Sequence, residues 1–104
     1  NLNRVGINDD DYAAIASDYL IAYTSVRTGR TVTLLAAGTM TNKSIVIKDE
    51  SGNAGANNIT IDGDGSETID GDATKAINAN FGSITIYSNG SNWFVISTTG
   101  NIIL

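Results

Sequence analysis

Residues 83–97 read SITIYSNGSNWFVIS, and this stretch decides the class of fold. Large apolar side chains alternate with Ser and Thr before the Asn89-Gly90 pair, and a second apolar run follows it. Alternation with a period of two is typical of a strand that has one buried face. Asn-Gly readily takes the positive φ angles of a two-residue hairpin turn. The stretch therefore predicts two antiparallel strands, 83–87 and 93–97, joined by a turn with positive φ at both central residues.

The same alternation recurs along the rest of the chain. Ile, Val and Thr make up 31 of the 104 residues, and these β-branched residues fit a pleated, half-buried surface better than a helix. Turns rich in Gly, Asn and Asp separate the apolar runs, which recur every 10–14 residues. We therefore predict an all-β fold, an antiparallel jelly-roll-like or Greek-key sandwich of about eight strands. The further strands expected are 19–24, 31–34, 44–48, 58–62, 73–80 and 102–104.

The composition excludes most catalytic chemistry. The chain has neither His nor Cys, so no Ser-His-Asp triad, thiolate nucleophile or histidine metal site can form. Six basic residues against 11 acidic ones give a net charge of −5, which is unsuited to nucleic acid. No apolar run approaches the 18 residues of a membrane span. We therefore expect no enzyme activity, no cofactor, no nucleic-acid partner and no membrane insertion.

An acidic loop, IDGDGSETIDGD at residues 61–72, is the best metal candidate. Its aspartates offer the hard oxygen ligands that calcium prefers; they are Asp62, Asp64, Asp70 and Asp72. Counted from Asp62, however, an EF-hand needs Gly where Glu67 stands and Glu where Ala73 stands. Asp and Gly are also the ordinary residues of tight turns. Turn formation is the simpler interpretation, so no metal site is assigned, and calcium binding stays open.

Aromatic and amide side chains around the central turn are the candidate binding residues. Tyr87 alternates with the neighbouring isoleucines and should point outward, where it can stack on a sugar or line a subunit interface. Trp93 lies in a strand that is apolar on both faces, and core packing is its simpler interpretation. The receptor-binding candidates are Tyr87, Asn89, Asn92 and Trp93.

Five segments together resemble the C-terminal domains of bacteriophage tail-fibre and head-fibre proteins, which are small β modules at fibre tips. Leu35 is a departure, because such domains often carry Pro after the TVTL strand. The matching segments are ASDYLI (16–21), RTVTL (30–34), IVIKDESGNA (45–54), NITIDGDGSETIDG (58–71) and FGSITIYSNGSNWFVIS (81–97).

The resemblance implies a virion structural protein on the particle surface that forms a homotrimer and attaches to a host-cell glycan or protein receptor. Residues 1–11 would be a neck from a preceding fibre shaft, and residues 12–104 the head domain. A thin core with seven aromatic residues, no Pro and only three Lys to protect strand edges also favours oligomerisation. The alternatives are a structural trimerisation cap or capsid decoration domain, a carbohydrate-binding module attached to an enzyme, and a calcium-dependent adhesin domain.

Overall fold

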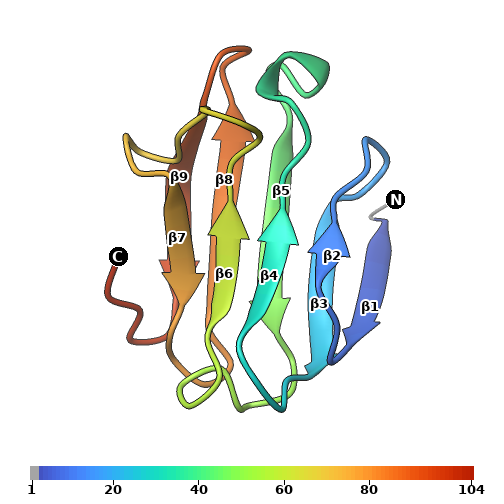
Figure 1. Ribbon diagram of the computed structural model, residues 1–104, viewed down its shortest axis with the longest axis vertical. Helices are drawn as coiled ribbons and strands as arrows, with labels where there is room; N and C mark the ends of the chain where they lie inside the picture. The colour runs from blue at the N-terminus through green and yellow to red at the C-terminus, as the bar shows by residue number, and fades with distance from the viewer. Residues whose placement is uncertain (1–2) are drawn as a thin grey trace.

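The computed structural model describes residues 3–104. The chain forms two β-sheets that pack face to face (Figure 1). One sheet has five strands in the order β1-β3-β5-β8-β9, and the other has four in the order β2-β4-β6-β7. A single 3-10 turn, η1 (Ala37–Thr39), is the only helical element among the described residues. The strands are β1 (Arg4–Asn8), β2 (Tyr12–Ala13), β3 (Leu20–Ser25), β4 (Arg30–Thr33), β5 (Ser44–Asp49), β6 (Ile59–Asp62), β7 (Thr74–Ile77), β8 (Ser83–Ser88) and β9 (Trp93–Thr99).

The chain winds as a coil through its first six strands. Each strand from β1 to β6 lies in the sheet opposite to the strand before it, so that successive strands within one sheet run parallel. The last three strands pair in the antiparallel direction: β7 with β6, β8 with β5, and β9 with β8. The all-β prediction is confirmed, but a purely antiparallel sandwich is wrong. Four of the seven strand pairings are parallel, because the chain changes sheet after each of these strands.

Most of the predicted strands are present. The alternating stretches correspond to β4, β5, β6 and β8, and the less regular stretch 73–80 contains β7. Residues 102–104 form no strand. The expected neck is segment 1–11, of which positions 1–2 lie outside the described residues. Arg4–Asn8 of this segment form strand β1, which pairs in parallel with β3. Val5 and Ile7 of this strand pack on the core, and their burial explains why it joins the sheet.

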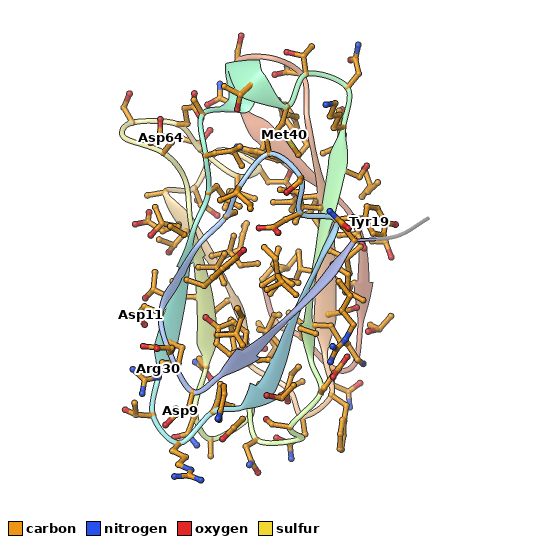
Figure 2. All side chains as sticks on the ribbon, turned by 90° about the vertical axis from the view of Figure 1, so that its right-hand side faces the viewer. Asp9, Asp11, Tyr19, Arg30, Met40 and Asp64 are labelled. Carbon is orange, nitrogen blue, oxygen red and sulfur yellow. The ribbon has the colours of Figure 1, made fainter. Side chains whose placement is uncertain are left out.

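Isoleucines in register fill the space between the sheets, where Figure 2 shows side chains from both layers meeting. Ile21, Ile47 and Ile84 are opposite one another across β3, β5 and β8, and all three are fully buried. Ile61 faces them from the other sheet's inner side and is buried as well. Because each such side chain stabilises the fold by about 1.5–3 kcal/mol when fully buried, these rows hold the two sheets together.

Candidate functional site

Three loops converge at one end of the sandwich, at the top of Figure 1. We call this the loop end and define it as residues 36–42, 63–72 and 89–92. The first loop is tied to β8, since the Asn42 N–H donates to the Ser88 carbonyl at 2.8 Å. The second is tied to the third, since the Thr68 N–H donates to Asn92 Oδ1 at 2.9 Å. The loop end is therefore braced by hydrogen bonds between segments far apart in the sequence.

The β8–β9 hairpin has a four-residue loop, because Ser88 and Trp93 are its last paired residues. Of the two central residues expected to have positive φ, only Gly90 does, at 98°. The two antiparallel strands are confirmed, and the two-residue turn is wrong. The reason is the Asn89 side chain, whose Oδ1 accepts the N–H groups of Ser91 and Asn92, both at 3.0 Å. An Asn that bonds to the backbone just after it can shape a longer turn in this way.

Replacing Asn89 by Gly should therefore lower the free energy of unfolding by about 1 kcal/mol, a typical net contribution of such hydrogen bonds. Asn89→Asp is the control, because it keeps the accepting oxygen. Urea denaturation followed by circular dichroism measures both, and equal stability of Asn89→Gly and the parent would show that the side chain does not hold the loop.

The four receptor-binding candidates are not brought together on one surface. Asn89 and Asn92 both lie at the loop end, where their Oδ1 atoms accept backbone N–H groups. Trp93 is fully buried beneath the loops, so its interpretation as a core residue is confirmed. Tyr87 lies on the outer face of the five-stranded sheet, next to Phe94.

Phe94 is a neighbour of Tyr87 that was not among the residues predicted from the sequence. The two ring centroids are 5.7 Å apart, and the ring planes are tilted by 32°. Such offset aromatic pairs contribute about 0.5–1.5 kcal/mol beyond the area they bury. A signal for Phe94 was available, because a residue that follows a buried Trp93 in a strand points to the opposite face.

The acidic residues of the loop end mainly shape the loops. Asp70 receives the Val95 N–H on Oδ1 at 3.0 Å and donates its own N–H to the Trp93 carbonyl at 3.0 Å, so it covers the start of the β9 edge. Glu67 Oε1 accepts the Ala37 N–H at 2.9 Å. Asp72 pairs with Lys75 at 2.6 Å. Within residues 3–104, no three acidic side chains come close enough together to hold a metal ion.

The exposed part of the loop end is open and polar. No pocket is present in the described part of the chain, so a ligand here would rest on an open surface. Small side chains that can donate or accept hydrogen bonds are exposed there: Thr39, Thr41, Asn42, Asp64, Asn89 and Ser91.

Comparison with known proteins gives no assignment. No protein-family model matches the chain, and no curated protein matches it. The described residues also contain no helix that is long and apolar enough to cross a membrane.

Proposed function

We propose that this chain is the head domain of a bacteriophage fibre, which assembles as a homotrimer on the virion and attaches to the host-cell surface. The observation that carries the proposal is the loop end, a set of braced loops with small polar side chains on an open surface. Two of the segments that resemble fibre-tip domains, 58–71 and 81–97, supply two of its three loops. The third loop, 36–42, is fastened to them through Ser88.

The geometry suits recognition of a glycan or of a polar protein surface. Hydroxyl and amide groups match the hydroxyl groups of sugars as donors and acceptors. Because hydrogen bonds between the loops already restrict their conformations, binding would cost less conformational entropy than with free loops. The expected receptor is therefore a surface polysaccharide or a surface protein of the host cell.

A structural cap or capsid decoration domain is the second candidate, and one observation favours it. The side-chain oxygens of Asn89 and Asn92 are already occupied by N–H groups of the domain itself. These two candidate residues are thus partly committed to holding the loops, which a cap needs as much as a receptor-binding tip does.

Binding of the labelled domain to host cells and to a glycan array distinguishes the two. Ser91→Arg places a bulky cation on the loop end, whereas Ala56→Arg places one at the opposite end of the sandwich, and both positions are exposed. We expect Ser91→Arg to weaken binding at least about tenfold, or 1.4 kcal/mol, and Ala56→Arg to leave it unchanged. Failure of the parent domain to bind would favour the cap, and equal loss in both variants would remove the loop end from the receptor site.

The oligomeric state is a separate prediction. Sedimentation equilibrium should give a mass about three times the 10.9 kDa of one chain. A mass of one chain that does not change with concentration would rule out the trimer.

A further inference from the structure

Four large apolar side chains lie on the outer face of the five-stranded sheet, among polar residues such as Lys48, Thr85 and Ser97. Leu20 and Val46 are opposite each other across β3 and β5, and Tyr87 and Phe94 across β8 and β9. Each alternates with an inward residue that is buried in the core, and each is itself only partly buried. We call Leu20, Val46, Tyr87 and Phe94 the outer apolar face.

The outer face of the four-stranded sheet is different in kind. Its outward positions alternate with the core residues Val32, Ile59 and Ile61, and only small side chains occupy them. The register places these outward residues in two rows across the sheet. They are Ala13, Thr31, Thr33, Thr60, Asp62, Thr74 and Ala76.

The charges are divided between the two sides in the same way. Eight of the 11 acidic residues lie in segments 9–11 and 62–72, and all but Asp70, which bonds to the start of β9, flank strands of the four-stranded sheet. In Figure 2, Asp11 and Asp64 lie on this side and Tyr19 on the other. Three basic residues lie in or next to the same sheet, so with the other seven acidic residues this side has a net charge of −4; the three are Arg27, Arg30 and Lys75.

This division disfavours contact between two copies through their four-stranded sheets. Like charges brought within the screening distance of about 8–10 Å repel each other. On the other side there are four acidic residues, including Asp70, against three basic ones. Two of those four acids, Asp18 and Asp49, are buried, so the exposed charges on the side of the five-stranded sheet present no negative excess to a neighbour.

We propose that copies of this chain contact one another through the outer apolar face, with the four-stranded sheet turned away from the other subunits. The proposal rests on the proposed homotrimer and names the surface that would form it. The broad face of the molecule measures 32 × 28 Å, roughly 900 Å² in projection, so it has room for the ~800 Å² that one partner contributes to a standard interface. Burying Tyr87 and Phe94 there also fits the enrichment of aromatic residues in interface cores.

A matched pair of variants tests the proposal. Val46→Asp places a carboxylate at the centre of the outer apolar face, on β5, and Thr60→Asp places one at the corresponding centre of the other sheet, on β6. Both positions are partly buried. Sedimentation equilibrium should show Val46→Asp at the mass of one chain and Thr60→Asp at three. The parent trimer should persist when NaCl is raised to 1 M, because an apolar contact is not weakened by screening.

Circular dichroism melting establishes that each variant is folded. Tyr87→Lys is the second variant on the same face, and it should dissociate the trimer even if Val46→Asp fails to fold. A trimer that survives Val46→Asp and Tyr87→Lys, or that Thr60→Asp also dissociates, would overturn the assignment of the face while leaving trimerisation intact. A monomeric parent would instead overturn the proposed trimer itself, so the two failures are distinguishable.

Discussion

Replacing Asp49 by Ala should lower the free energy of unfolding by about 4 kcal/mol. Asp49 ends strand β5 with its side chain on the inner face, and it is fully buried. One carboxylate oxygen accepts the N–H and hydroxyl of Ser51 and the N–H of Gly52, and the other accepts the N–H groups of Ala54 and Phe81. Losing the carboxylate would leave several of these donors unpaired, at about 1–3 kcal/mol each if they stay buried.

Two controls separate this effect from the loss of a surface charge. Glu50→Ala removes the neighbouring carboxylate, which forms an exposed pair with Arg4, and it should change stability little. Asp49→Asn keeps the shape of the side chain but turns an amide toward N–H donors. Its free energy of unfolding should therefore lie between those of Asp49→Ala and the parent. Urea denaturation measures all three, and a loss below about 1 kcal/mol for Asp49→Ala would contradict the structural role.

The Asp49 contribution should also depend on pH. Burial alone would raise the pKa of Asp49, but the hydrogen bonds from Ser51, Ala54 and Phe81 outweigh it and hold the pKa below its ordinary value. A carboxyl group whose folded pKa is lowered stabilises the protein above its unfolded pKa of about 3.9. That stabilisation is lost as the pH falls through the folded pKa. The difference in stability between the parent and Asp49→Asn should therefore be constant above about pH 5 and shrink below pH 4.

Replacing Trp93 by Ala should lower the free energy of unfolding by about 3–5 kcal/mol, as for other large aromatic residues in cores. Trp93 begins strand β9, is fully buried, and belongs to the same core cluster as Ile69 and Ile86. Its removal would leave a cavity beneath the loop end, because the loops above it are held by their own hydrogen bonds. Urea denaturation followed by circular dichroism measures the loss.

Trp93→Phe is the matched control and should cost only about 1 kcal/mol. The indole Nε1 is buried and has no hydrogen-bond partner among residues 3–104, and an unpaired buried donor costs about 1–3 kcal/mol. Phenylalanine removes this donor while it fills most of the space. The relief of the unpaired N–H therefore offsets part of the packing that is lost. If Trp93→Phe were as destabilising as Trp93→Ala, the indole N–H would have to be stabilised in the folded protein.

The local pattern of the sequence predicted where the strands lie. A period of two is a property of each strand by itself, so 83–87 and 93–97 could be recognised without knowing their neighbours. The burial of Trp93 followed from its place in a strand that is apolar on both faces. The side-chain hydrogen bonds of Asn89 could not be predicted, because an Asn-Gly pair can occur both in a two-residue turn and in a longer loop.

The coil could not be recognised from the sequence, because its turns differ in length. Leu20 pairs with Val46, 26 residues later, while Tyr12 pairs with Val32, only 20 residues later. A repeat is recognised from a fixed period, and unequal connections between equivalent strands remove that period.

The patterns in the sequence were enough to predict an all-β chain and the positions of most of its strands, and its composition excludes chemistry based on His or Cys. The structure was needed to find the parallel pairings, the convergence of the loop end and the role of Asp49, one of whose donors is the N–H of Phe81, 32 residues away. The physical reason is that alternation reports which face of a strand is buried, whereas strand order and direction depend on where each connection crosses to the other sheet. Those crossings depend on contacts between residues far apart in the chain, and a local pattern contains no information about such contacts.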